Sequence, residues 1–294
     1  MTKKENDYVK KINTERKIIS QFLIKDKEIK YSQNNKAYLQ VTLQDKTGQI
    51  IGRMFKNKAR AEHEKIETNT VYNIVGKIQE FPKKSGKFNI IIDIINPTQK
   101  YDENDFILQL KELEKHEKYL QDSINNIKNP ELKEILKNIF NDKEIYEKFI
   151  TAPAAKKHHH NYIGGLLEHT NEVIAICKNL KEIYEEIDED LLITGAILHD
   201  IGKIYTYDYT YTEIEVNYEG TMLDHIFIGS NLVKEKMNTL NISSKTKIDL
   251  LHLILSHHGE LNLGWGSAID PKKVEAIALH HADDMSAKIN KSLQ

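Results

Sequence analysis

The feature that most constrains this chain is a histidine followed directly by an aspartate at the end of an apolar segment. His199 and Asp200 come after residues 191–198, LLITGAIL, which predict a buried helix. A carboxylate at the end of a buried helix needs a counter-charge, and a metal ion is the usual one. The pair therefore predicts a helical domain built around a metal site.

Further histidines and aspartates surround this pair in the sequence. Eleven of the 13 histidines lie between residues 158 and 281. The other candidates are His169 within HHHNYIGGLLEHT (158–170), Asp224 and His225, His257 and His258 after a predicted helix over 248–256, and Asp283 in a predicted helix over 273–289. Imidazole and carboxylate ligands without thiolate suit Mn²⁺, Fe²⁺, Co²⁺, Ni²⁺ or Zn²⁺ rather than Ca²⁺.

The order H…HD…D resembles the minimal signature of the HD superfamily of metal-dependent phosphohydrolases. The matching residues are His169, His199, Asp200 and Asp283; the segment ADDMSAK puts Asp283, rather than Asp284, in the ligand position. The resemblance implies an all-α bundle with two divalent ions. One ion would take His169, His199, Asp200 and Asp283, and the other Asp200 as a bridge with His225, His257 and His258. Such a pair catalyses in-line displacement at phosphorus with a shared hydroxide.

Mn²⁺ is the first candidate for both ions, with Co²⁺, Fe²⁺, Ni²⁺, Mg²⁺ and Zn²⁺ as alternatives. Asp200 and Lys203 are the expected catalytic residues. Lys203 comes one helical turn after His199, where it could hold a phosphate or the leaving oxygen; the alternative is a solvent-exposed lysine. His159 and His160 precede a predicted helix start at Gly164, where imidazoles and free N–H groups would bind phosphate.

Residues 16–98 alternate between apolar and polar side chains with the period of a β-strand. Strands are expected over 17–29, 37–43 and 49–55, then a helix over 58–67, then strands over 71–76 and 88–95. That order is typical of the OB-fold, a five-stranded Greek-key barrel whose open face binds single strands. The segment YLQVTLQDKTGQIIGRMF resembles OB domains of the tRNA-anticodon type.

The net charge of −2 hides an asymmetry along the chain. Residues 1–100 hold 21 basic and 11 acidic side chains, a net charge of +10, and residues 101–294 have a net charge of −12. A basic barrel fits a polyanion. The candidates for base stacking are Phe22, Tyr38, Phe55, Phe81 and Phe88, and the candidate cations are Arg53, Lys83, Lys84 and Lys87. A barrel of this size turns about half of its aromatic side chains inward, so each aromatic is equally well explained as core.

Residues 103–149 predict helices, because Ile107, Leu110, Leu113 and Leu120 recur at helical spacing and Asn129-Pro130 ends the first run. The chain is therefore expected to divide into an OB domain over 1–100, a helical connector over 101–150 and an HD domain over 151–294.

An OB-type domain followed by PAAKKHHHNYIGGLLEHT (153–170) and ILSHHGELNLGWGS (254–267) resembles the YhaM-type 3′–5′ exoribonucleases. The resemblance covers residues 15–290. It implies stepwise hydrolysis of single-stranded RNA from the 3′ end to nucleoside 5′-monophosphates, with single-stranded DNA as a further substrate. Two alternatives stay open. One is a phosphohydrolase of small nucleotides such as dNTPs or signalling nucleotides, and the other is a nucleic-acid-binding module with an inactive HD site.

Nothing in the sequence predicts a membrane partner. No run of about 18 apolar residues occurs. Cys177 is the only cysteine, which excludes an intrachain disulfide and fits a reducing compartment. We therefore expect a cytoplasmic protein.

Overall fold

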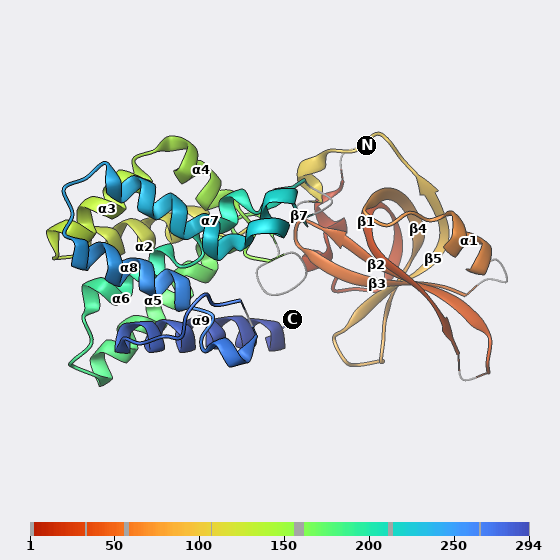
Figure 1. Cartoon of the computed structure of the whole chain (residues 1–294). Coiled ribbons are helices and arrows are strands. Elements are labelled where there is room, and N and C mark those ends of the chain that lie inside the picture. Colours follow the sequence, from red (N-terminus) through yellow and green to blue (C-terminus); the bar gives the residue numbers. More distant parts are fainter. Residues whose placement is uncertain are drawn as a thin grey trace. The chain divides into compact units, whose positions relative to one another are not determined.

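The computed structural model describes residues 3–32, 34–55, 59–106, 108–155, 162–210, 214–264 and 266–293. The chain divides into two compact units, Met1–Leu108 with Tyr209–Glu213, and Gln109–Asp208 with Ile214–Gln294. The first unit contains a closed β-barrel, and the second is a bundle of helices (Figure 1). The predicted fold class, an OB barrel followed by a helical HD domain, is confirmed.

The barrel has its strands in the order β1-β2-β3-β5-β4, with one helix between β3 and β4. Its elements are β1 (Arg16–Tyr31), β2 (Ala37–Asp45), β3 (Gly48–Met54), α1 (Ala59–Lys65), β4 (Thr70–Glu80) and β5 (Phe88–Pro97). The long strand β1 pairs with β4 along its first half and with β2 along its second half. The register of β1 against β2 shifts between Ile24 and Asp26, and a β-bulge of this kind lets a long strand bend from one partner strand to the other.

One of the predicted stacking residues, Phe22, belongs to the barrel core instead. Phe22 is fully buried among the apolar side chains of the barrel, and Lys3 Nζ lies 3.4 Å from the centre of its ring. Phe88 is half-buried against the same core. Phe22 is therefore not available for stacking on a nucleobase, because residues on this side of β1 face the barrel interior.

The helical unit consists mainly of eight α-helices within the described residues. They are α2 (Leu113–Asn126), α3 (Pro130–Phe140), α4 (Lys143–Thr151), α5 (Gly165–Ile183), α6 (Glu189–Leu198), α7 (Tyr218–Asn238), α8 (Ser244–Ser256) and α9 (Val274–Leu293). Between α6 and α7 in the sequence come the 3-10 helix η4 (Ile201–Tyr205) and the strands β6 (Tyr207–Tyr209) and β7 (Ile214–Val216), which pair as a two-stranded sheet.

Helix α6 is the central helix of this unit, as its apolar sequence predicts. The Asp188 side chain accepts a hydrogen bond from the backbone N–H of Leu191 and so caps its first turn. Every residue from Leu191 to Leu198 is buried, and α6 packs against α5, α8 and α9. The end of this helix therefore delivers His199 and Asp200 into the interior of the bundle.

The predicted helix over 103–149 is wrong in its first ten residues. A 3-10 turn covers Glu103–Asp105, and α-helix begins only at Leu113. Between them, Gln109 forms a β-bridge with Ile163, and the Leu110 N–H donates to the Ile163 carbonyl. This pairing with a distant segment prevails over the helical spacing of the apolar residues.

Among the helices in the described ranges, none is both long enough and apolar enough to cross a lipid bilayer.

Candidate metal centre and strand-binding face

Five helices of the helical unit bring their histidines and aspartates together, two of them at their C-terminal ends. His169 comes from α5, His199 and Asp200 from the end of α6, His225 from α7, His257 and His258 from the end of α8, and Asp283 from α9. His169, His199 and His257 are fully buried, and Asp200 is 2% exposed. All seven predicted metal ligands thus come from elements that pack on one another.

Asp200 lies between two groups of histidines. Its Oδ1 is 3.2 Å from His225 Nε2 and 3.6 Å from His257 Nε2. Its Oδ2 is 3.6 Å from His169 Nε2 and 3.4 Å from His199 Nε2. Each carboxylate oxygen therefore faces its own pair of ring nitrogens, which is the arrangement of a bridging ligand.

The two aspartates of α9 have different surroundings. Asp283 Oδ1 lies 3.0 Å from His169 Nε2 and 3.9 Å from His199 Nε2. Asp284 instead forms an ion pair with Lys288 at 2.8 Å, one turn further along the helix. Asp283 therefore belongs to the cluster and Asp284 to the outer face of α9.

The other ring nitrogen of four of these histidines is already occupied. His199 Nδ1 lies 2.9 Å from the Ala196 carbonyl and His257 Nδ1 lies 2.7 Å from the Ile254 carbonyl. His169 Nδ1 contacts Ser286 Oγ at 3.0 Å, and His225 Nδ1 contacts Asp224 Oδ1 at 2.6 Å. Because a carbonyl or carboxylate can only accept, it assigns a proton to Nδ1 of His199, His225 and His257, and a neutral ring then has its lone pair on Nε2, toward Asp200. The Ser286 hydroxyl acts as an acceptor in the same way, because its own proton goes to Glu172.

Several atoms that face the centre of the cluster have no hydrogen bond within the described residues. They are Asp200 Oδ1, His225 Nε2 and His257 Nε2. In addition, His169 Nε2 and His199 Nε2 lie only 3.3 Å apart, a costly approach for two lone pairs unless a cation or proton is shared between them. The donor set fits divalent cations, in two groups: His169, His199 and Asp200, and His225, His257 and His258.

The electrostatics of the cluster are those of a cation site. Burial opposes the charge on Asp200, but Lys203 and His199 outweigh it and hold its pKa well below the usual range. Burial and the neighbouring His257 and His225 lower the pKa of His258 to about 3, so that its ring is neutral at pH 7. Burial also disfavours charged rings at His199 and His225, but Asp200 outweighs that effect and raises the pKa of both. An ionised Asp200 beside a neutral His258 is the combination that metal binding requires, and a bound cation would replace the protons that Asp200 attracts to His199 and His225.

The sequence does not predict the hydrogen-bonded residues behind His169, which are Ser286, Glu172 and Asn290. Ser286 Oγ contacts His169 Nδ1 at 3.0 Å and donates to Glu172 Oε2 at 2.6 Å. Asn290 donates to the same carboxylate oxygen at 2.6 Å. Partners of this kind fix the tautomer and orientation of a metal-binding histidine. Only the register of α5 against α9 brings these residues together, so no sequence motif indicates them.

The predicted stacking residues of the barrel form pairs on its outer side. The Tyr38 and Phe55 ring centres are 4.9 Å apart, and the Arg53 guanidinium lies 5.1 Å from the Phe81 ring centre. The Gln40 side chain holds Arg53 in place, because its Oε1 accepts from Arg53 Nε at 3.3 Å while its Nε2 donates to Glu28. Phe55 and Phe81 are each 55% exposed. We call these four side chains, Tyr38, Arg53, Phe55 and Phe81, the aromatic face.

Three lysines extend from the hairpin next to the aromatic face. Lys83, Lys84 and Lys87 lie between β4 and β5, and all three are exposed. The predicted phosphate-binding residues His159 and His160 lie outside the described residues.

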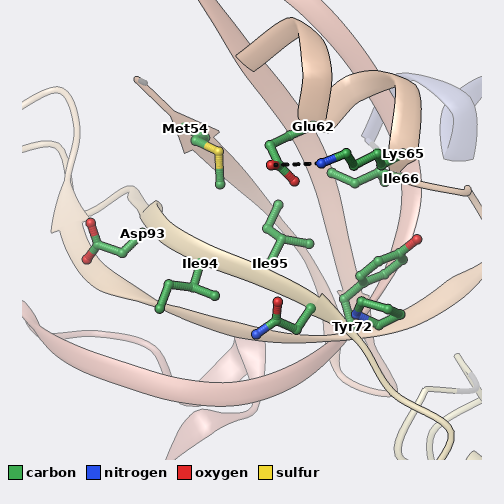
Figure 2. Close-up of a pocket in the computed structure, with 10 residues that line it drawn as sticks. Met54, Glu62, Lys65, Ile66, Tyr72, Asp93, Ile94 and Ile95 are labelled. Atoms are coloured by element: carbon green, nitrogen blue, oxygen red, sulfur yellow. Dashed lines mark ion pairs between the residues drawn. The ribbon is translucent and has the colours of Figure 1, made fainter. Parts of the chain in front are cut away.

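A separate pocket of about 590 Å³ lies between α1 and β5 of the barrel unit (Figure 2). Met54, Ile66 and Ile95 supply apolar lining, and Glu62 pairs with Lys65 at its upper rim at 3.9 Å. The described residues that line it include no predicted metal ligand and no member of the aromatic face. The pocket is therefore distinct from both sites.

Comparison with known proteins agrees with this organisation. The HD domain family matches residues 166–288, and the family of OB-fold nucleic acid binding domains matches residues 23–98. A 3′–5′ exoribonuclease YhaM of Oceanobacillus iheyensis is 33% identical over 274 residues, which cover 91% of this chain and 83% of the relative. A protein of the same name from Bacillus pumilus is 30% identical over 277 residues, covering 91% and 84%.

Among solved structures, the HD domain of the L. monocytogenes phosphodiesterase PgpH aligns with 55% of this chain and 74% of its own, at 17% identity and a TM-score of 0.28. That structural similarity is too low to support a conclusion. The two sequence relatives match this chain over nine-tenths of its length, which includes both its OB-fold region and its HD region. The chain therefore belongs to the YhaM family of 3′–5′ exoribonucleases.

Proposed function

We propose that this protein is a metal-dependent 3′–5′ exoribonuclease that hydrolyses single-stranded RNA, and single-stranded DNA as a further substrate, to nucleoside 5′-monophosphates. The observation that carries the proposal is the position of Asp200, whose two oxygens each face a separate pair of histidine Nε2 atoms. The polarity and the preference for RNA are taken from the names of the two relatives.

The chemistry of the cluster suits hydrolysis at phosphorus. Two divalent ions, Mn²⁺ by preference, would be held by two ligand sets that share Asp200. These sets are His169, His199, Asp200 and Asp283 for one ion, and Asp200, His225, His257 and His258 for the other. When bound, such ions supply an activated water and positive charge at the non-bridging phosphate oxygens.

Lys203 is the proposed contact to the substrate phosphate or leaving oxygen. Its Nζ lies 2.5 Å from Asp200 Oδ2, and its side chain is 11% exposed. Burial disfavours the ammonium, but Asp200 outweighs that effect and raises the pKa of Lys203. The side chain therefore carries a positive charge beside the bridging carboxylate. We assign His159 and His160 to the same phosphate on the basis of the sequence.

The aromatic face and the hairpin lysines are the proposed binding site for the strand. Tyr38, Phe55 and Phe81 offer ring faces for base stacking, which tolerates any sequence. Arg53, Lys83, Lys84 and Lys87 offer cations for the phosphates. A barrel that holds the strand lets one site cleave successive nucleotides without sequence preference.

A substrate comparison tests the proposal against the two alternatives. Metal-stripped protein is supplied with Mn²⁺ and incubated with single-stranded RNA, with the same RNA in a duplex, or with dNTPs, and the products are separated. We expect release of nucleoside 5′-monophosphates from the single strand in preference to the duplex, and no release without metal. Turnover of dNTPs with intact RNA would favour the small-nucleotide enzyme. Bound RNA without any product would favour the inactive module.

Removal of the three hairpin lysines is expected to weaken strand binding. Replacing Lys83, Lys84 and Lys87 together with alanine should lower the affinity for a single-stranded RNA on the order of tenfold, because three cations for the backbone are lost. The slope of log affinity against log salt should fall by about 2, at about 0.7 for each phosphate contact. Cleavage of a dinucleotide, which has a single internucleotide phosphate and therefore gains little from backbone contacts, should be little changed.

The control for this variant replaces Lys4, Lys10 and Lys11, which are exposed lysines of the same unit outside the hairpin. It removes the same charge, so a general electrostatic effect would appear equally in both variants. Equal losses would contradict a specific role for the hairpin. The measurement is fluorescence anisotropy of a labelled RNA across a salt series.

A further inference from the structure

Asp224 has a backbone conformation that is unusual for a residue with a side chain. Its φ is 62° and its ψ is 153°, inside the span that is otherwise helix α7. This combination is essentially confined to glycine, because a Cβ there clashes with the neighbouring backbone. Strained residues of this kind persist where surrounding contacts hold them, and they cluster at functional sites.

Close contacts on both sides of Asp224 hold this kink in place. Before it, Gly220 packs so tightly that a Cβ would lie 2.6 Å from Thr206 O. After it, a Cβ on Gly202 would collide with the backbone oxygen of His225 and lie 2.6 Å from Gly229 N. The parts of α7 just before and just after Asp224 thus both pack closely against the η4 segment, and Asp224 between them takes up the change of direction.

The kink removes a partner that two of the other ligand histidines, His199 and His257, obtain from their own helices. His199 and His257 stand at helix C-termini, and their Nδ1 atoms contact the carbonyls three residues earlier. His225 stands at the start of the helical segment that follows the kink, where no such preceding helical carbonyl is in line. The Asp224 carboxylate takes this role, with Oδ1 at 2.6 Å from His225 Nδ1 and accepting from Ile226 N–H at 3.1 Å.

We propose that Asp224 is a positioning residue that holds the His225 ring with its proton on Nδ1 and its Nε2 toward Asp200. The strained backbone is retained because it brings this carboxylate to the ring while η4 and α7 stay in contact. The inference rests on the proposed function insofar as His225 is a metal ligand. The Asp224 side chain is 62% exposed, so burial alone does not require it there.

The test measures metal affinity and stability separately. Metal-stripped wild-type, Asp224→Gly and Asp224→Asn proteins are titrated with Mn²⁺, and free Mn²⁺ is followed by electron paramagnetic resonance. Glycine relieves the strain but removes the acceptor, so we expect the weaker of two Mn²⁺ sites to lose roughly 10–100-fold in affinity. The melting temperature of the stripped protein should stay within about 3 °C of wild type or rise. Asparagine keeps an acceptor oxygen and tolerates positive φ, so it should keep most of the affinity.

Glu112→Gly is the matched control. Glu112 also has a positive φ, 53°, and pairs with Lys115 at the start of α2, where both side chains are exposed. Its replacement should leave both Mn²⁺ affinities unchanged. Wild-type affinity in Asp224→Gly would overturn the inference, and so would a large fall in its melting temperature or an equal loss in Asp224→Asn. If the wild-type protein itself binds no Mn²⁺, the proposed metal centre fails, and that result is distinct from failure of the Asp224 proposal.

Discussion

Replacement of Asp200 by asparagine is expected to reduce RNA hydrolysis on the order of 10³-fold, while the affinity for single-stranded RNA stays within about twofold of wild type. Asparagine keeps the volume of the side chain but removes the negative charge that faces four histidine rings and Lys203. The variant therefore lacks the one carboxylate that lies between the two groups of histidines. RNA binding should persist because the aromatic face and hairpin lysines belong to the barrel unit.

The matched control for this variant is Asp284→Asn. This variant also removes one negative charge, next to Asp283 on α9. The Asp284 carboxylate that it removes pairs with Lys288 on the outer face of the helix. Hydrolysis should therefore change little. Rates of mononucleotide release and anisotropy of labelled RNA measure the two quantities. Activity retained in Asp200→Asn, or lost equally in Asp284→Asn, would contradict the assignment of the bridging carboxylate.

Gly202→Ala is expected to destabilise the helical unit by about 2–3 kcal/mol and to lower activity by more than that loss of folded protein explains. The added Cβ would meet the backbone of His225 and Gly229, which cannot move aside as a side chain can. Separation of η4 from α7 would carry His225 away from Asp200, from which it is now 3.2 Å. Chemical unfolding gives the stability, and the rate per folded molecule gives the second effect.

Gly195→Ala provides the comparison for this second variant. Gly195 is also buried, inside α6, but the nearest atom to its added Cβ is Leu253 Cδ2 at 2.5 Å, the far end of a flexible side chain. That side chain can rotate, and alanine favours the helix by up to about 1 kcal/mol. The loss should therefore be clearly smaller than in Gly202→Ala. A reversed order would show that the η4–α7 contact does not set the geometry of the site.

The sequence predicted those features that depend on local pattern. Apolar residues 191–198 read as a buried helix that ends in His199 and Asp200, and the structure has that helix at the centre of its bundle. Strand periodicity over residues 16–98 predicted the barrel, whose order of elements is confirmed. In both cases neighbouring residues alone determine the element.

Other features depend on contacts between distant segments, and the sequence did not predict them. The chain at 109–110 pairs with Ile163, although its apolar spacing is helical. Phe22 faces the barrel interior because of how β1 pairs on both sides. The strain at Asp224 follows from contacts on either side of it, made by Gly220 and Gly202.

A time course on an RNA that carries a label at its 5′ end, with Mn²⁺ present, tests the central claim most directly. An enzyme that removes nucleotides one at a time from the 3′ end yields a descending ladder of labelled products. The proposed function predicts that ladder for wild-type protein and uncut RNA for Asp200→Asn. Immediate release of a labelled mononucleotide, or an RNA that stays intact with wild-type protein, would contradict it.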